Sequence, residues 1–334
     1  MKKVTKILSL MVILTMLAVS FIGCGKKTAE QQTSNNNTAS NNETKPIKIA
    51  VVLKALNSDY WKIVQAGAMD AAKQLGVEVE VLGPNAETDI AGQTSIMEDQ
   101  IIKKVSALVV APSQPSAAIA TFDKAAEANI PVLLIDTNAN WDKKLSFIGT
   151  GNYAGGEVGG KFIASKLQKG DKVVIIRGAL GDGTHDERVN GAKKAMEDAG
   201  LQVVAVQPAN SDRNMGMSVM ENLLQTYPDV KAVFCSNDEM ALGAQRAIMQ
   251  AGKKGIITVG FDGSPDALKS IKAGELTGSV AQSPYNIGKF GVEAAVKVAK
   301  GEKIDARIDT GTSMITAENV DQAQADLDKI LGKK

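Results

Sequence analysis

The residues best suited to bind or transform a ligand follow short apolar runs, at points where buried strands would end. Asn237-Asp238-Glu239 follows one such run and Asp262 follows the next. The Asn237 amide can donate a hydrogen bond to a ligand hydroxyl and also accept one from it. One residue of the triplet is also expected to cap the next helix, and this role suits Asp238 best. These positions predict a binding site for a polar ligand at the strand ends.

Tyr60 and Trp61 form a second candidate element. Aromatic residues make up only 4% of the chain, so two that stand side by side are informative. We interpret this pair as part of a binding surface rather than as core filler. Ala and Gly are abundant instead, which suits helices packed closely on a parallel sheet.

The motifs of common enzyme classes are missing from the sequence. His185 is the only histidine, and without a second metal ligand or a nucleophile nearby we expect it at a polar loop position. Gly155 and Gly160-Lys161 have the spacing of a phosphate loop, but Phe162 stands where a Mg²⁺-binding Ser or Thr is required. Close helix packing explains these glycines better. We therefore expect no enzymatic activity, no cofactor and no metal site.

Charge and length limit the class of protein. The formal net charge is +1, whereas binding to nucleic acid or to an anionic membrane surface needs a clear excess of clustered Lys and Arg. We therefore expect no nucleic-acid partner and a ligand that is neutral or small. The 334 residues are enough for two ordinary globular domains.

The N-terminus has the layout of an export signal. Met1 to Lys6 carries three lysines, and Ile7 to Ile22 is an uncharged apolar run, shorter than the roughly 20 residues of a usual membrane span. Phe21-Ile22-Gly23-Cys24 resembles the bacterial lipobox, with Phe in place of the usual Leu. We predict a lipoprotein signal peptide over residues 1–23 and lipidation of Cys24. A permanent N-terminal anchor helix, or an ordinary secretory signal with an incidental cysteine, is the alternative.

The segment that follows the signal has no pattern of a folded element. Residues 25–46 are rich in Asn, Ser, Thr and Gln and lack apolar periodicity, so we expect a disordered tether over residues 24–46. The only other cysteine, Cys235, lies in an apolar run, where a thiol behaves as a small buried hydrophobe. No disulfide is expected.

From Ile47 onward, short β-branched runs alternate with longer helical patterns. This alternation is typical of an α/β fold whose parallel sheets are covered on both faces. The pattern reaches a Gly-rich stretch at residues 149–160 and then starts again, so we predict two doubly wound, Rossmann-like lobes. The predicted strands are Ile47–Leu53, Val77–Leu82, Ala107–Val110, Val132–Ile135, Leu145–Ile148, Lys172–Arg177, Leu201–Val206, Val230–Cys235, Ile256–Phe261 and Leu276–Ala281.

Ligands of such sheets bind beyond the carboxyl ends of the strands, so the strand-end loops of the two lobes are expected to converge on one cleft. No Gly-rich turn follows the first strand, where Lys54-Ala55-Leu56-Asn57 stands, and this disfavours a dinucleotide-dependent dehydrogenase. Helices are predicted to start after Ser58 and Asp212.

The strand-end segments carry a family resemblance. The chain resembles the ribose-type family of periplasmic sugar-binding proteins, which share their fold with the ligand domains of LacI-type repressors. The resemblance covers nearly all of Ile47 to Thr316. It rests on Asp136 after Pro131-Val132, Asn152 with Gly155-Gly156, Glu187-Arg188 with Gly191, Gln207-Pro208-Ala209 with Asp212-Arg213, Asn237 to Gly243, Val259 to Gly263, and Ala281-Gln282 with Pro284.

The resemblance implies a periplasmic-binding-protein type I fold with a ligand cleft between two lobes. The expected boundaries are 47–150 plus 283–311 for the N-terminal lobe and 151–282 plus 312–334 for the C-terminal lobe. It also implies ligand-binding roles, in which polar groups hold ring hydroxyls and Tyr60 and Trp61 stack on the sugar ring. The full expected set is Lys54, Ser58, Tyr60, Trp61, Asp136, Thr137, Thr150, Arg188, Asn237, Asp262 and Gln282.

Three departures from the ribose pattern affect the expected ligand. Ser211 stands where relatives place an aromatic residue on the opposite lobe, and Thr137 stands where a ribose binder has Arg. Lys54 replaces a small polar residue and, with Trp61, looks more like the allose-binding branch. A hexose of the allose type is therefore preferred. A pentose such as ribose, a furanose-type signal and a nucleoside stay open.

The resemblance further implies transport. We expect a monomer, tethered to the outer face of the cell membrane through Cys24, that closes around a monosaccharide by a hinge motion. It would deliver the sugar to the permease and ATPase of an ABC importer. A transcriptional regulator would need a helix-turn-helix where this chain has an export signal. A ligand-sensing module of a signalling receptor remains an alternative.

Overall fold

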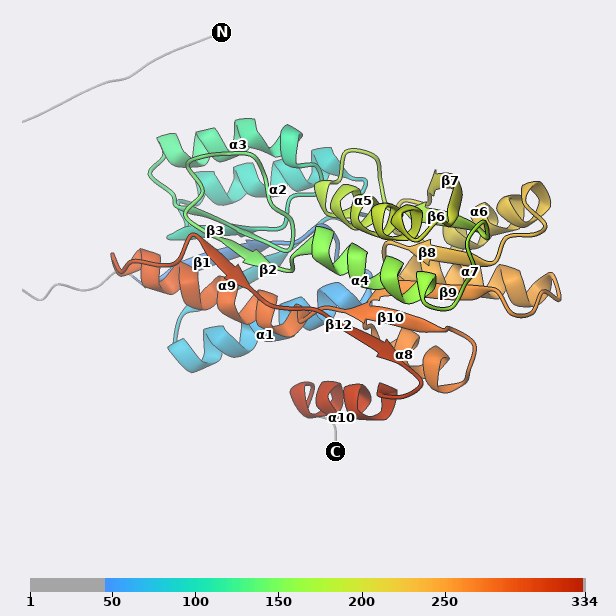
Figure 1. Ribbon diagram of the computed structural model, residues 1–334. Coiled ribbons are helices and arrows are strands. Elements are labelled where there is room, and N and C mark those ends of the chain that lie inside the picture. The colour runs from blue at the N-terminus through green and yellow to red at the C-terminus, as the bar shows by residue number, and fades with distance from the viewer. Residues whose placement is uncertain (1–45, 333–334) are drawn as a thin grey trace, which may run out of the picture. The chain divides into compact units, whose positions relative to one another are not determined.

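The computed structural model describes residues 46–332, so the predicted signal peptide, Cys24 and most of the predicted tether lie outside the described residues. Two six-stranded sheets form the centre of the described part (Figure 1). Every strand pair is parallel except β10 with β12. The predicted α/β fold with two parallel-dominated sheets is confirmed.

The first lobe is defined here by the sheet with strand order β11-β5-β4-β3-β1-β2. Its helices α1 and α9 cover one face of that sheet and α2 and α3 cover the other (Figure 1). The elements of this lobe are β1 (Lys48–Val52), α1 (Asp59–Leu75), β2 (Glu78–Leu82), α2 (Ile90–Ile102), β3 (Ala107–Val110), α3 (Pro115–Glu127), β4 (Val132–Ile135), β5 (Phe147–Gly149), α9 (Pro284–Ala299) and β11 (Arg307–Asp309).

The second lobe is defined by the sheet with strand order β12-β10-β9-β8-β6-β7. Apolar clusters on both faces bury the centres of its four inner strands, whereas the two edge strands are only partly buried. The elements of this lobe are α4 (Asn152–Ala164), β6 (Lys172–Arg177), α5 (Gly183–Asp198), β7 (Gln202–Pro208), α6 (Arg213–Thr226), β8 (Ala232–Cys235), α7 (Asp238–Gln250), β9 (Ile257–Asp262), α8 (Pro265–Lys272), β10 (Gly278–Ala281), β12 (Ser313–Thr316) and α10 (Val320–Ile330).

Three short segments carry the chain between the two sheets. They are residues 150–151 between β5 and α4, residues 282–283 between β10 and α9, and residues 310–312 between β11 and β12. Each contains only two or three residues without helix or strand. Such segments can absorb the backbone rotations of a hinge while the two lobes stay rigid.

The glycines of α4 pack this helix directly against α5. A Cβ atom on Gly156 would overlap the carbonyl oxygen of Arg188, and one on Gly160 would approach the carbonyl oxygen of Ala192 to 2.5 Å. The helix-packing interpretation of this Gly-rich stretch is therefore confirmed. The close contact also fixes the helix that carries Arg188.

All ten predicted strands are present, with ends shifted by at most two residues. β11 and β12 were not predicted, because they are three and four residues long and carry polar side chains rather than an apolar run. Among the described residues, no helix is long and apolar enough to cross a membrane.

Candidate functional site

The strand ends of both lobes meet at a small cavity, which we call the cleft site. Its volume is about 20 Å³, room for about one water molecule, because side chains from the two lobes touch across it. The lining residues are Lys54, Tyr60, Trp61, Glu87, Asp136, Thr184, His185, Arg188, Asn237 and Asp262. Seven of them belong to the set expected from the sequence.

The first lobe contributes the aromatic side of the cleft site. Ser58 caps α1, since its hydroxyl accepts from the Trp61 amide, and the first turn of the helix then presents Tyr60 and Trp61. Their rings meet edge to face with centroids 4.9 Å apart. The Tyr60 hydroxyl donates to Asp136 Oδ1 over 2.5 Å. Burial, followed by the charge of Asp136, raises the pKa of Tyr60 well above its usual value, so the phenol keeps its proton.

The second lobe contributes a fixed guanidinium. Arg188 donates from Nε to Asn152 Oδ1 over 2.9 Å and from Nη1 to the Ser236 carbonyl over 2.9 Å. Its guanidinium carbon lies 3.9 Å from the centre of the Phe261 ring. A third, longer contact of 3.4 Å reaches Asp262. These contacts hold the guanidinium in one orientation toward the cavity.

The two cleft aspartates adopt backbone conformations that L-residues rarely use. The φ angle is 60° at Asp136 and 124° at Asp262. Strain of this kind costs about 1–3 kcal/mol per residue and persists where the surrounding structure imposes it, commonly at ligand sites. The backbone at both positions therefore directs a carboxylate into the cleft at an energetic cost.

Asp262 is buried next to both a cation and an amide. Gln282 Nε2 donates to Asp262 Oδ1 over 2.7 Å. Burial raises the pKa of Asp262 well above its usual value and outweighs the opposite effect of Arg188. Gln282 Oε1 and Thr150 Oγ1 are both buried and have no hydrogen-bond partner among the described residues. An unpaired buried acceptor is costly, so both atoms are suited to a ligand or water partner.

The helix cap after β8 differs from the prediction. Asn237, not Asp238, is the N-cap of α7, because Asn237 Oδ1 accepts from the Met240 amide over 3.0 Å. Asp238 is buried and accepts from the Ser264 amide and the Ser279 hydroxyl instead. The prediction was wrong because a polar triplet does not reveal which side chain the neighbouring strand will bury. Among residues 46–332, the Nδ2 group of Asn237 makes no hydrogen bond, whereas Oδ1 is used by the cap.

Four of the expected residues, among them Gln282, do not line the cleft cavity itself. Ser58 borders a neighbouring cavity of about 80 Å³. Thr137 donates to Asp136 Oδ2 over 2.8 Å and also contacts Thr184 of the second lobe. Thr150 lies in the first segment that joins the lobes and is 1% exposed.

His185 occupies a different environment from the expected polar loop. It lies in the first turn of α5 and is 3% exposed. Its ring nitrogens are paired with the hydroxyls of Ser236 at 2.8 Å and Ser211 at 3.0 Å. Burial lowers its pKa to about 3, so the ring is neutral at physiological pH. The loop prediction was wrong because two serines, distant in sequence, satisfy the imidazole.

Sequence reasoning also missed Glu87 and Asp182, which the fold brings to the cleft. The Trp61 indole donates to Glu87 Oε1 over 2.8 Å. Burial raises the pKa of Glu87, whereas the charge of Lys54 and the hydrogen bond from Trp61 oppose this rise. Asp182 pairs with Lys54 from the opposite lobe. A signal for both was present, since each lies in a segment after a predicted strand, but the partners come from remote parts of the chain.

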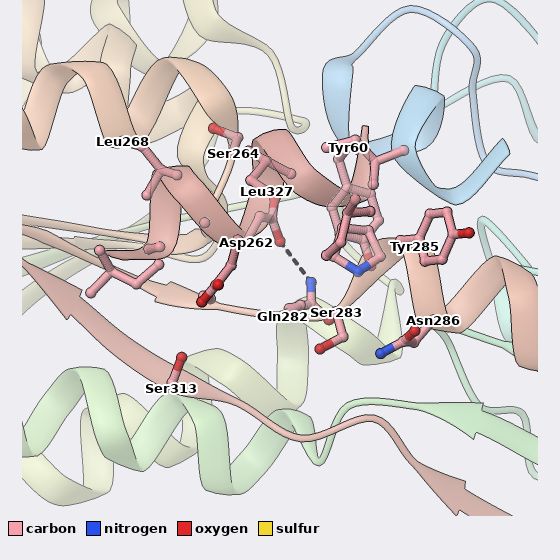
Figure 2. Close-up of a pocket in the computed structure, with 18 of the residues that line it drawn as sticks. Tyr60, Asp262, Ser264, Leu268, Gln282, Ser283, Tyr285, Asn286, Ser313 and Leu327 are labelled. Carbon is pink, nitrogen blue, oxygen red and sulfur yellow. Dashed lines mark hydrogen bonds between the residues drawn. The ribbon is translucent and has the colours of Figure 1, made fainter. Parts of the chain in front are cut away.

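A larger cavity of about 350 Å³ adjoins the cleft site beside the chain segment at residues 282–283. It shares Tyr60 and Asp262 with the cleft site. Gln282 also lines the larger cavity, and Figure 2 shows its hydrogen bond to Asp262 at this junction. Leu268 of α8 and Leu327 of α10 form its apolar wall.

Two parallel-sheet lobes with a polar, aromatic-sided cleft at their strand ends define a class of ligand-binding protein. The chain belongs to the periplasmic binding protein family, since residues 49–303 match the periplasmic binding protein domain. The predicted resemblance to the ribose and allose branch of this family is confirmed by the relatives described next.

Relatives in sequence and in structure are binding proteins for sugars. The ribose import binding protein of Escherichia coli K12 is 37% identical over 270 residues, which is 81% of this chain and 90% of the relative. The D-allose-binding periplasmic protein of the same organism is 36% identical over 76% of this chain and 85% of the relative. A carbohydrate transporter solute-binding protein from Agrobacterium radiobacter, solved with D-arabinose, has a TM-score of 0.81 and 34% identity. The match covers 85% of this chain and 99% of that chain.

Proposed function

We propose that this protein captures a monosaccharide or a related polyol in the cleft site and delivers it to the permease of an ABC importer. The observation that carries the proposal is the convergence of carboxylate, guanidinium and amide groups with two aromatic rings on one cavity between the lobes. The relatives support it, since their names describe binding of ribose, allose or arabinose.

The chemistry of the cleft matches the surface of a sugar ring. Asp136 and Asp262 accept hydrogen bonds from ring hydroxyls and Arg188 donates to them, and such charge-assisted bonds are about twice as strong as neutral ones. The side-chain oxygen Oε1 of Gln282, unpaired among the described residues, supplies one further acceptor. The rings of Tyr60 and Trp61 pack against the apolar C–H face of the sugar.

The proposed ligand contacts are those expected from the sequence. Aromatic side chains stack on the sugar ring from the first lobe only. On the second lobe, the position expected to be aromatic is occupied by Ser211, which is paired with His185. The ligand-binding residues are proposed to be Lys54, Ser58, Tyr60, Trp61, Asp136, Thr137, Thr150, Arg188, Asn237, Asp262 and Gln282.

Closure of the two lobes around the ligand follows from the placement of these groups on both lobes. Tyr60 and Asp136 belong to the first lobe, whereas Arg188 and Asp262 belong to the second. A sugar that touches both sets stabilises the closed arrangement, because a ligand shifts an equilibrium only by its differential affinity for the two states. The permease then recognises the closed form.

A hexose of the allose type is the preferred ligand. Lys54 adds a cation to the first-lobe side, and Thr137 leaves out the bidentate donor expected of a ribose binder. The uncharged hydroxyl of Thr137 bonds to Asp136 and thereby changes the acceptor that faces the ring. A pentose is the next candidate.

We also infer that Cys24 is lipidated after removal of residues 1–23. A lipid on Cys24, with residues 24–46 as a tether, would keep the folded lobes at the outer face of the cell membrane. Radiolabelled palmitate incorporated by the full-length protein and lost in Cys24→Ser tests this inference. Equal labelling of the two proteins contradicts it.

The ligand can be identified with residues 45–334 alone, because they form one compact unit. Thermal melts of this part against pentoses, hexoses, polyols and nucleosides are the most direct screen, since a ligand at 100 times its Kd adds about 2.7 kcal/mol of stability. We expect a clear shift with a hexose. A shift with nucleosides alone, or no shift with any compound of the panel, would contradict the sugar proposal.

A further inference from the structure

A buried ion pair joins the two lobes at the edge of the cleft site. Lys54, which follows β1 of the first lobe, places its Nζ 2.6 Å from Asp182 Oδ2 of the second lobe. Both side chains are 2% exposed. The pair is therefore shielded from water in the closed arrangement and cannot persist when the lobes separate.

Asp182 is positioned for this role by the helix that it starts. It is the N-cap of α5, and its Oδ1 accepts from the Thr184 amide over 2.9 Å. One carboxylate oxygen thus fixes the side chain to the helix, while the other faces Lys54. A capping Asp has little rotational freedom left to lose when it forms the pair.

A further polar contact crosses the cleft beside this pair. The Thr184 hydroxyl contacts the Thr137 hydroxyl of the first lobe. Ser211 of the second lobe and Glu87 of the first line the same small cavity between the lobes. Asp182 and Thr184, at the start of α5, thus both contact the first lobe.

The charges around Lys54 keep the pair ionised. Burial lowers the pKa of Lys54, but Asp182, Asp136 and Glu87 together raise it above its usual value. Burial raises the pKa of Asp182, but the charge of Lys54 and the hydrogen bonds from Lys54 and the Thr184 amide outweigh this effect, so that its pKa lies below its usual value. Glu87, Asp182 and His185 have the mutual spacing of a metal site, but the Lys54 ammonium already supplies the cation there.

We propose that Asp182 is a positioning residue for ligand capture, which pairs with Lys54 across the cleft and holds the lobes closed in the absence of ligand. Opening separates two charges that face one another at hydrogen-bond distance. Water then solvates both, so the net effect is smaller than the direct attraction. We expect a shift of about tenfold in the ratio of closed to open molecules, the size of a typical charged hydrogen bond.

This pairing has a consequence for ligand binding that rests on the proposed function. A larger closed fraction before binding raises the apparent affinity, because the measured Kd is the intrinsic one divided by the competent fraction. It also slows ligand release, since the pair must break before the cleft opens. Asp182 therefore acts on affinity without having to touch the ligand.

The test measures closure without ligand, on residues 45–334. Spin labels are placed through Gln74→Cys on α1 and Gln250→Cys on α7, both exposed, while Cys235 is buried. Distances between the labels are measured by double electron–electron resonance. Asp182→Asn keeps a capping acceptor and removes the charge, and Lys54→Met removes the other partner. Each is expected to lower the closed-to-open ratio about tenfold, and the double variant to add little to either.

Asp198→Asn is the matched control. Lys194 and Asp198 also pair at 2.6 Å, but both are exposed and lie on one helix, so this variant is expected to leave closure unchanged. Melting curves verify that each variant folds. If the distances between the labels without ligand are the same in Asp182→Asn and Lys54→Met as in the protein that keeps both partners, the proposal is overturned.

Ligand kinetics separate this role from direct contact and from failure of the proposed function. With a sugar found in the melts, Asp182→Asn is expected to raise the dissociation rate about tenfold with a smaller change in the association rate. A loss of affinity with unchanged closure in the unliganded protein would make Asp182 a direct ligand contact and contradict the proposal. If no sugar binds, the proposed function fails, and the distance measurement still decides whether the pair closes the lobes.

Discussion

The strand orders β11-β5-β4-β3-β1-β2 and β12-β10-β9-β8-β6-β7 give each strand of the first lobe a counterpart in the second. Asp136 follows β4 and Asp262 ends β9, so the two cleft aspartates occupy equivalent positions, and both have positive φ angles. The helices after β1 and β6 differ instead. The first carries Tyr60 and Trp61, whereas the second carries Thr184, His185 and Arg188. The repeated fold supplies matching acceptors, and the first helix of each lobe makes the two walls of the cleft different.

The largest expected effect comes from the charged wall of the second lobe. Arg188→Ala removes a buried guanidinium and leaves Asp262 without its cation, so we expect a loss of about 2–5 kcal/mol in ligand binding, well over tenfold in Kd. Isothermal titration calorimetry measures it. Arg246→Ala on the exposed face of α7 is the charge-matched control. An affinity near that of the wild type would show that Arg188 does not donate to the ligand.

The next effect compares the helix packing of the two lobes. A Cβ atom on Gly156 would overlap the Arg188 carbonyl in the second lobe, and one on Gly288 would overlap the Val64 carbonyl in the first. Each Gly→Ala variant is expected to lose about 1–3 kcal/mol of unfolding free energy through overpacking. Urea unfolding tests both. If only one variant is destabilised, the two lobes do not share this packing rule.

His185 makes the stability of the second lobe depend on pH. Its pKa falls from 6.5 to about 3 in the fold, so below pH 6.5 the unfolded chain binds a proton that the folded protein does not. Stability due to this residue is complete above pH 6.5 and is lost as the pH falls. Between pH 7.5 and 5 we expect a loss of about 2 kcal/mol.

The contribution of His185 is obtained by comparing the stability loss at acid pH in the wild type and in a His185 variant. Asp182, Lys54, Arg188 and Arg177 face the imidazole, and other buried carboxyls titrate as well, so the quantity to compare is the change between wild type and His185→Asn. Urea unfolding at pH 7.5 and pH 5 is expected to show a smaller acid loss in the variant. Parallel curves for the two proteins would contradict the buried neutral histidine.

The smallest effect concerns the helix caps. Asp212 accepts from the Met215 amide over 2.8 Å in the second lobe, whereas Ser58 accepts from the Trp61 amide over 3.5 Å in the first. Asp212→Ala is expected to cost about 1 kcal/mol and Ser58→Ala about 0.5 kcal/mol. Thermal unfolding of the two variants ranks them. The reverse order would indicate that Ser58 has a further structural role.

The sequence predicted the elements that are set by local pattern and missed those set by distant partners. Strands such as Lys172–Arg177 and Ala232–Cys235 were found because a parallel strand buried on both faces has a nearly continuous run of apolar residues. β11 and β12 were not, since their few polar residues become strands only by pairing with β5 and β10.

The same distinction holds for the site. Asp136 and Asp262 were predicted from their positions at strand ends and from the family resemblance. The pairing of Lys54 with Asp182 joins residues 128 positions apart, and His185 was assigned to a loop because Ser211 and Ser236 approach it only in the fold. Contacts between the lobes have no local pattern that a sequence could display.

The central claim is that one sugar is held by both lobes at once. Isothermal titration of D-allose and D-ribose into residues 45–334, for the wild type and for Asp136→Ala and Asp262→Ala, tests it most directly, because the two aspartates are equivalent positions on opposite walls. We predict saturable binding of at least one of these sugars by the wild type and a loss of at least tenfold in each variant. Binding that survives unchanged in either variant, or no binding of either sugar by the wild type, would contradict the account.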